Sequence, residues 1–316
     1  MAFIDELNNP IVREMRKDYN RAIAQKIRNR LQQLENANEK DKRRWVWELL
    51  QNAKDTVSGD RKVDIKIIVT EEGIEFSHNG GYFSPRNITN LVHQISSKEG
   101  EENIGRFGTG FLTTHTLSRV IEVSGVFFEG DNYSNFKIIL DRTGNTEAEL
   151  VECLEKTWET FEEVKLEKIP TETIWTSFKY LNHNKKVAED TINDFITFIH
   201  YNLAFVQKIG SVIVDNKLNN NSFSIQKNKT EEINKLLSII TFEEQINNYR
   251  TEKKLLFANN SIIQGAIEIE KIDNNKYAIK EIAANIPRLF CAFPLIGTET
   301  FYFPLVLNSR KFMPKT

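Results

Sequence analysis

Cysteine, long apolar runs and excess charge are scarce in this chain. It has two cysteines in 316 residues, Cys153 and Cys291, which are far apart and have no Cys or His neighbour at metal-ligand spacing. This excludes a disulfide framework and a cysteine-based metal site, and it favours a reducing, cytoplasmic location. Neither the N-terminal MAFIDELNNP nor any later stretch has an apolar run long enough for a signal peptide or a membrane span.

The charge balance lacks the basic excess of a dedicated nucleic-acid binder. Lys plus Arg number 42 against 44 for Asp plus Glu, giving a net charge of -2. Locally, Arg13–Arg44 holds eleven basic and five acidic residues, and Glu147–Glu172 holds nine acidic and three basic ones. Blocks of this kind are typical of solvated faces. With 40% hydrophobic residues, the length is sufficient for two domains with a core.

The segment Trp45–Asp55, WVWELLQNAKD, predicts a helix with one polar and one apolar face. Glu48, Asn52 and Asp55 follow one another at four and three residues and therefore share one face. Roughly opposite lie apolar residues, namely Val46, Leu49, Leu50, Ala53 and Val57. A carboxylate can take a proton from water, and a carboxamide oxygen can bind Mg²⁺ without adding charge. Such a stripe is also what any solvated helix face presents.

A second stretch, SSKEGEENIGRFGTGFLTTHTLS, brings Gly105, Gly108 and Gly110 before a predicted helix at Phe111–Leu117. Glycines before a helix N-terminus let backbone N–H groups approach an anion closely, which indicates phosphate binding. No strand leads directly into the glycines, so the dinucleotide fingerprint does not fit. The alternative is a flexible turn.

Periodicity along the chain predicts an α+β fold in which a mixed, mostly antiparallel sheet carries helices on one face. The expected helices are 11–36, the segment containing Glu48, 87–95, 111–117, 187–206 and 231–240. Pro10 stands at the first position of the first of these helices. Expected strands are 63–70, 73–77, 121–128, 134–140, 148–154, 161–166, 173–181, a hairpin over 211–228, 262–272 and 276–282. The composition shifts toward Asn, Ile and Lys after His183, which predicts one domain over 1–182 and a second, smaller α+β domain over 183–316.

Three ordered blocks carry a resemblance to a known family. ELLQNAKD at Glu48–Asp55, FSHNGG at Phe76–Gly81 and IGRFGTGF at Ile104–Phe111 resemble the N, G1 and G2 boxes of the GHKL ATPases. The resemblance covers roughly Arg44–Leu181 and is nearest to the ninety-kilodalton heat-shock chaperones and the sacsin-like proteins, which share the SSK and GRFGTGF wording.

The resemblance implies a GHKL-type α/β sandwich that binds ATP and Mg²⁺ under a mobile lid. It gives Glu48 the role of activating water and Asn52 that of holding Mg²⁺. The residues that it places around the nucleotide are Asp55, His78, Gly80, Lys98, Gly105, Phe107, Gly108, Gly110 and Thr173. Lys98 would reach a phosphate from the lid, and Thr173 would lie near the adenine, although Glu172 stands where the family has a Gly.

One position departs from the family pattern. His78 occupies the place of the Asp that accepts the adenine amino hydrogen. A neutral imidazole has one unprotonated nitrogen that can accept such a bond. We therefore expect adenine affinity to weaken below the ordinary histidine pKa of about 6.5.

The function predicted from these residues is Mg²⁺-dependent ATP hydrolysis that closes a lid and switches a chaperone-like or sacsin-like protein. The alternatives are a MutL-like or MORC-like clamp on DNA, supported only by the basic segment Arg13–Arg44, and a nucleotide sensor that does not hydrolyse. A histidine kinase is disfavoured because Glu48 is present and every histidine, from His78 onward, follows the N box.

The partners expected are ATP, a second copy of the chain, and a client or effector region outside this sequence. We expect the sequence to be a fragment, because it stops just after an apolar segment. By loose similarity of FPLVLNSRKF to the chaperones, Arg310 or Lys311 would contact the γ-phosphate. A C-terminal Arg that is simply solvated is the alternative.

Overall fold

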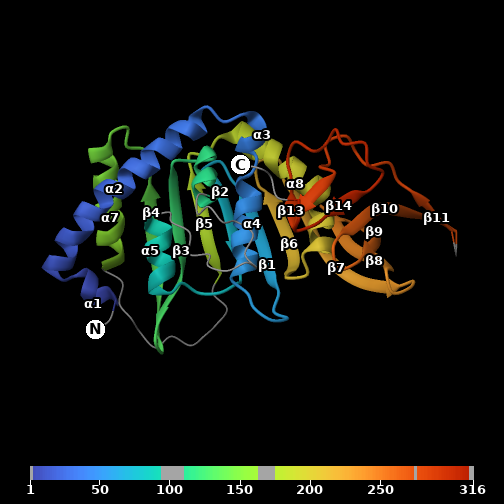
Figure 1. Cartoon of the computed structure of the whole chain (residues 1–316), viewed down its shortest axis with the longest axis horizontal. Helices are drawn as coiled ribbons and strands as arrows, with labels where there is room; N and C mark the ends of the chain where they lie inside the picture. The colour runs from blue at the N-terminus through green and yellow to red at the C-terminus, as the bar shows by residue number, and fades with distance from the viewer. Residues whose placement is uncertain (1–2, 94–109, 163–174, 274–275, 313–316) are drawn as a thin grey trace. The chain divides into compact units, whose positions relative to one another are not determined.

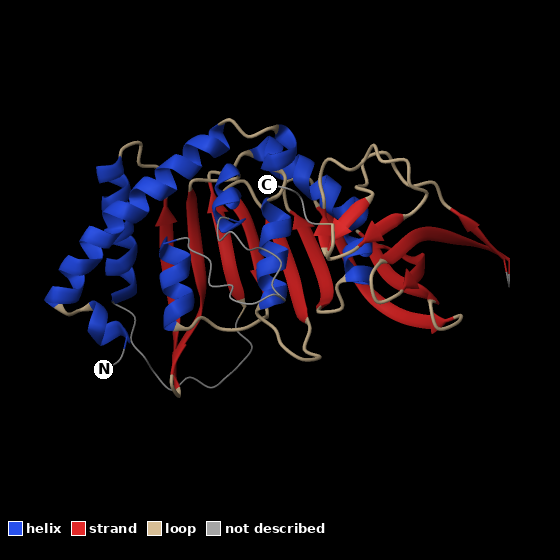
Figure 2. Cartoon of the chain, in the orientation of Figure 1, coloured by secondary structure: helices blue, strands red, loops and turns tan. Residues whose placement is uncertain are grey.

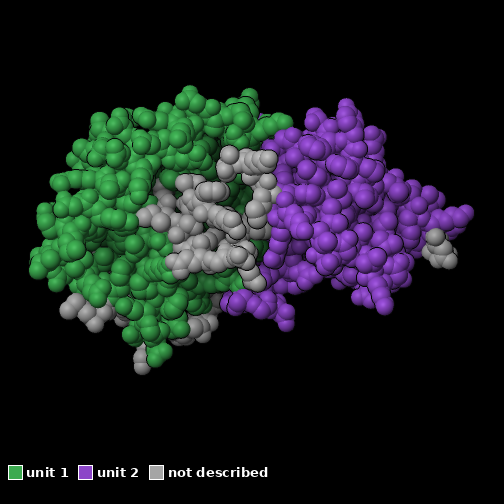
Figure 3. All heavy atoms as spheres, viewed as in Figure 1, with its two compact units in different colours: residues 1–57, 70–188 green, residues 58–69, 189–316 purple. Residues whose placement is uncertain are grey.

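The computed structural model describes residues 3–93, 110–162, 175–273 and 276–312. The chain forms two compact units, shown in different colours in Figure 3. Unit 1 comprises residues 1–57 and 70–188, and unit 2 comprises residues 58–69 and 189–316.

Unit 1 is an antiparallel sheet with helices across one face (Figures 1 and 2). Its elements are α1 (Phe3–Leu7), α2 (Pro10–Glu35), α3 (Glu39–Lys42), α4 (Trp45–Asp55), β2 (Gly73–His78), α5 (Pro85–His93), α6 (Gly110–Thr113), the 3-10 helix η1 (Thr114–Thr116), β3 (Val120–Glu129), β4 (Asn132–Asp141), α7 (Glu147–Glu162) and β5 (Thr176–Leu181). The strand order is β2-β5-β3-β4. The predicted α+β fold class is confirmed.

The sheet of unit 1 is antiparallel at every junction. Strand β5 lies between β2 and β3, pairing Phe76 with Phe178 on one side and Val123 with Phe178 on the other. Phe76, Val123 and Phe178 are buried, so this face of the sheet forms the floor of the core. Helix α4 packs on it through Trp45, whose ring lies 6.1 Å from that of Tyr180.

Helix α2 begins and ends where the sequence predicts. The Asn9 side chain accepts a hydrogen bond from the Ile11 N–H, and Pro10 occupies the first turn, where its missing N–H has no cost. The C-terminal part of its apolar stripe is buried, including Ile23 and Ile27. Among the described helices, this one included, none is both long and apolar enough to cross a membrane.

Unit 2 is built on a sheet that α8 covers. Its elements are β1 (Val63–Val69), most of α8 (Lys185–Phe205), β6 (Ile209–Asn216), β7 (Asn221–Glu232), β8 (Leu237–Ile246), β9 (Tyr249–Asn259), β10 (Gln264–Asp273), β11 (Lys276–Ile279), β12 (Leu289–Cys291), β13 (Phe293–Pro294) and β14 (Val306–Asn308). The order is β13-β12-β14-β10-β9-β8-β7-β6-β1, with β11 on β10. Phe205 of α8 lies 6.1 Å from Phe257 and 5.4 Å from Phe290, ring to ring.

Three predicted elements are wrong. Residues 148–154 are not a strand but part of helix α7, and residues 161 and 162 end that helix, while 163–166 lie outside the described residues. The buried residues of α7 recur at helical spacing, but the acidic residues between them made this spacing hard to recognise. The buried residues are Leu150, Leu154, Trp158 and Phe161. Residues 231–240 are not a helix: they comprise the end of β7, a turn over 233–236 and the start of β8. There the Asn234 side chain accepts hydrogen bonds from the Leu236 and Leu237 N–H groups, a local turn that competes with helix.

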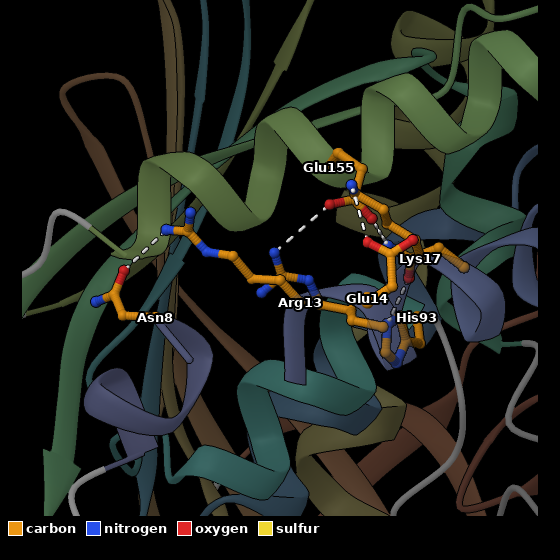
Figure 4. Close-up of polar contacts among 8 residues, drawn as sticks. Asn8, Arg13, Glu14, Lys17, His93 and Glu155 are labelled. Carbon is orange, nitrogen blue, oxygen red and sulfur yellow. Dashed lines mark hydrogen bonds and ion pairs between the residues drawn. The ribbon is translucent and has the colours of Figure 1, made fainter. Parts of the chain in front are cut away.

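A buried polar network joins α2, α5 and α7 (Figure 4). His93 Nε2 donates to Asn20 Oδ1 at 3.1 Å, the Asn20 amide donates to Glu155, and Arg16 lies 3.5 Å from the same carboxylate. Burial lowers the pKa of His93 to about 4, and the cations of Arg142 and Arg16 act in the same direction. His93 is therefore neutral in the folded protein at physiological pH.

We expect this histidine to destabilise the fold in acid. The unfolded chain protonates near pH 6.5 but the folded chain only near pH 4, so the stability is complete above pH 6.5 and declines as the pH falls toward 4. At pH 5 the loss is about 2 kcal/mol. The variant His93→Gln keeps a donor for Asn20 but cannot titrate. Denaturant unfolding should show a smaller loss of stability between pH 7 and 5 for this variant than for the wild type, and an unchanged loss would contradict the assignment.

Candidate functional site

Helix α4 presents the candidate site residues on one face. The predicted apolar stripe is buried, with Val46, Leu49, Leu50 and Ala53 at most 1% exposed. This burial fixes the rotation of the helix and leaves Glu48, Asn52 and Asp55 half-buried on the other side. About one turn of helix separates Glu48 from Asn52, and slightly less than one turn separates Asn52 from Asp55. The structure thus brings these three side chains into a row within unit 1.

The Glu48 carboxylate lies at the start of α4, between a cation and a glycine. Arg44 lies 3.8 Å away, and the Glu48 side chain is 20% exposed. A Cβ on Gly110, where α6 begins, would overlap Glu48 Oε2. Any other residue at this position would require the Glu48 carboxylate to shift. Gly110, predicted as part of the phosphate loop, is placed next to the predicted water-activating group.

Asp55 lies near the opposite end of the same helix. Its carboxylate forms an ion pair with Lys54 at 2.7 Å, and both side chains are mostly buried. The two charges compensate each other locally, which reduces the penalty of holding a carboxylate there.

Gly80 and Gly81 contact the C-terminal end of α4. A Cβ on Gly80 would overlap Thr56 Oγ1, and one on Gly81 would lie 2.8 Å from the Thr56 carbonyl oxygen. Thr56 Oγ1 is held in place because it donates to the Ala53 carbonyl at 2.6 Å. These glycines therefore let the segment after β2 approach the helix end closely. Sequence reasoning missed Thr56, since nothing in its type or spacing predicts this contact.

His78 ends β2 beneath that glycine pair. It is 3% exposed, and its Nδ1 accepts a hydrogen bond from the Gly80 N–H at 3.1 Å. Burial lowers the pKa of His78 to about 4. The expected loss of affinity below about pH 6.5 is therefore placed at the wrong pH, because desolvation keeps the ring neutral to much lower pH. The nitrogen expected to accept from adenine is also already occupied by Gly80.

Other predicted residues cannot be placed in this site. Lys98, Gly105, Phe107, Gly108 and Thr173 lie outside the described residues. Arg310 and Lys311 are exposed residues near the end of unit 2. Sequence reasoning also missed Arg44, although its i, i+4 spacing to Glu48 is a recognisable signal for an ion pair.

Comparisons with known proteins give a distant likeness. No protein-family model and no curated protein matches the chain. The ATPase region of Saccharomyces cerevisiae topoisomerase II matches with 13% identity and a TM-score of 0.37 over 68% of this chain and 57% of that one. The same region bound to ICRF-187 (dexrazoxane) matches with 12% identity and a TM-score of 0.36 over 66% and 58%. The chain thus spans less than two thirds of either structure, and a likeness of this size assigns no activity.

The contact between Gly80 and Thr56 can be tested by substitution. Gly80→Ala should destabilise unit 1 by about 1–3 kcal/mol, since the added methyl group overlaps a fixed hydroxyl. Adding Thr56→Ala should recover part of this loss, because it removes the atom that is overlapped. Gly265→Ala is the matched control, as its Cβ would meet no atom closer than 3.6 Å. Thermal unfolding of the wild type, the three single variants Gly80→Ala, Thr56→Ala and Gly265→Ala, and the double variant measures the effect. Additive losses in the double variant would refute the contact.

Proposed function

We propose that the chain binds Mg²⁺-ATP and hydrolyses it, with Glu48 as the general base and Asn52 as the metal ligand. The observation that carries the proposal is the placement of these side chains one turn apart on α4, beside Gly110. A carboxylate that is only 20% exposed is shielded from bulk water and can still reach a water at the surface of the site.

The residues present fit a magnesium ion that also binds phosphates. Mg²⁺ takes oxygen ligands and commonly uses one or two protein groups together with substrate phosphates. In the part of the chain that the structure describes, no three His, Cys, Asp or Glu side chains gather into a metal site. We give Asn52 the role of protein ligand because its carboxamide oxygen, on the half-buried polar face of α4, is of the type that Mg²⁺ binds. The ion, when bound, would neutralise charge on the triphosphate.

The nucleotide would lie along α4, with its phosphates and its base at opposite ends of the helix. From Glu48 to Thr56 the helix rises about 12 Å at 1.5 Å per residue, comparable to the extent of a nucleoside triphosphate. If hydrolysis takes place at Glu48, the phosphates lie at the start of the helix and the base lies near Asp55, Gly80 and His78. Glu48 would then take the proton of the attacking water, and the half-buried face of α4 would limit access of other water molecules.

The wider role that we propose is a conformational switch. The resemblance of the three sequence blocks supports a lid over the phosphates and a chaperone-like or sacsin-like protein in the cytoplasm. A second copy of the chain and an effector region beyond this sequence would be the partners. The alternative is a nucleotide sensor, in which nucleotide binding alone would switch the conformation without hydrolysis.

The metal ligand can be tested by calorimetry. Mg²⁺-ATP should bind Asn52→Ala at least about tenfold more weakly than wild type, because a ligand of the ion is lost. Asn193→Ala, which changes an exposed residue of α8, is the control. In EDTA the difference between wild type and Asn52→Ala should largely disappear. Equal affinities with Mg²⁺ would remove Asn52 from the site.

The general base can be tested by turnover. Glu48→Gln should lower the hydrolysis rate by roughly 10²–10⁴-fold while Mg²⁺-ATP still binds, because a carboxamide cannot accept the proton. Glu159→Gln, an exposed carboxylate on α7, should leave the rate unchanged. If wild type and Glu48→Gln both bind ATP and neither turns it over, the sensor alternative replaces hydrolysis.

A further inference from the structure

Asn79 and Gly80 form the one Asn–Gly pair in the sequence. Asparagine is a thermolabile residue, and it reacts most readily before glycine, because no side chain shields the next backbone nitrogen. In this reaction the Gly80 nitrogen loses its proton and bonds to the Asn79 side-chain carbonyl carbon, while the side-chain nitrogen leaves as ammonia. A water molecule then opens the resulting succinimide ring. The product is aspartate or isoaspartate, so an amide is exchanged for a carboxylate.

Contacts on both sides hold this pair of residues in place. His78 ends β2, where it pairs with Thr176 of β5. The Gly80 N–H donates to His78 Nδ1 at 3.1 Å, so the proton that the reaction must remove is held in a hydrogen bond. Gly80 is buried, and a Cβ on it would overlap Thr56 Oγ1, so it lies closely against the end of α4. Ring closure therefore requires these contacts to break first.

The hydrogen bond from Gly80 to His78 is maintained at neutral pH. Burial lowers the pKa of His78 to about 4, so Nδ1 keeps the lone pair that accepts the bond. The ring also stacks near Phe178, with centroids 6.3 Å apart and planes 26° apart. A side chain that accepts from the N–H two residues further on acts as Asn or Asp does in an Asx-turn. An asparagine at position 78 could therefore make the same contact.

We propose that Asn79 is a site of spontaneous deamidation, and that the hydrogen bond from Gly80 to His78 and the contact of Gly80 with Thr56 keep it unreacted in the folded chain. The reaction then proceeds from molecules in which the end of β2 has opened locally. Isoaspartate lengthens the backbone between Asn79 and Gly80, so Gly80 could no longer meet Thr56. The modification would permanently alter this end of α4, and the inference does not depend on the proposed nucleotide site.

The test is peptide mapping by mass spectrometry of the whole 316-residue chain after incubation at neutral pH. His78→Leu removes the acceptor and keeps a side chain of similar size. It should deamidate at Asn79 roughly 2–10-fold faster than wild type, the range expected for the loss of a hydrogen bond that opposes opening. His78→Asn, whose Oδ1 can accept from the Gly80 N–H, should return the rate toward the wild-type value.

Two controls locate the effect. Asn79→Gln should remove the modification from this peptide, because a glutamine would have to close a larger and less favourable ring. Asn260, which precedes Ser261 in the exposed connection between β9 and β10, should react at the same rate in wild type and in both His78 variants.

A synthetic peptide with the sequence of residues 74–84 gives the rate without the fold. Folded wild type should react at least about tenfold more slowly than this peptide, because only locally opened molecules react. Equal rates in the peptide and the folded chain would overturn the proposal. So would equal rates in wild type and a His78→Leu variant that circular dichroism shows to be folded. Should His78→Leu fail to fold, the comparison of the peptide with folded wild type still decides the question.

Discussion

Burial of the apolar face of α4 is the constraint on which the site depends. Trp45, Val46 and Leu50 are inaccessible to solvent. Trp45 packs against Tyr180 of the unit 1 sheet. A helix anchored on one side in this way cannot rotate without exposing large apolar side chains. The polar face is therefore held at a fixed angle, and the order Glu48, Asn52, Asp55 becomes an order in space. The chemistry proposed here needs that rigidity more than it needs any single hydrogen bond.

Two glycines let other segments meet the ends of this helix. Gly110 lies against Glu48 at one end, and Gly80 lies against Thr56 at the other. Neither has a positive φ, so their value is the absence of a side chain and not an unusual backbone conformation. Between these two close approaches, from Glu48 to Thr56, the helix rises about 12 Å at 1.5 Å per residue.

Much of the architecture could be predicted from the sequence, because periodicity and caps are local. The Asn9 and Pro10 start of α2 and the alternation of β5 are examples, and both have the expected ends to within a few residues. Helix α7 was missed although Leu150, Leu154, Trp158 and Phe161 recur at helical spacing, since short windows of this segment also fit a strand. In the site, spacing along one helix revealed the row of polar side chains. The Gly80 contact with Thr56 could not be predicted, because it joins segments that meet only in the folded chain. The hydrogen bond from the Gly80 N–H to His78 Nδ1 is local, but it depends on a backbone conformation that the residue types do not specify.

The parallel pairing of β1 with β6 has a consequence for how unit 2 is made. Val63 pairs with Ile209, so the first strand of this unit precedes residues 70–188 and the rest follows them. A ribosome would release β1 long before its partner, and the sheet of unit 2 can be completed only after all of unit 1 has been synthesised. Pairings between such distant residues slow folding. A chain cut to begin at residue 189 would leave β6 as an open edge, with unpaired backbone groups available to other chains. Unit 2 therefore has no continuous stretch of sequence that encodes it alone.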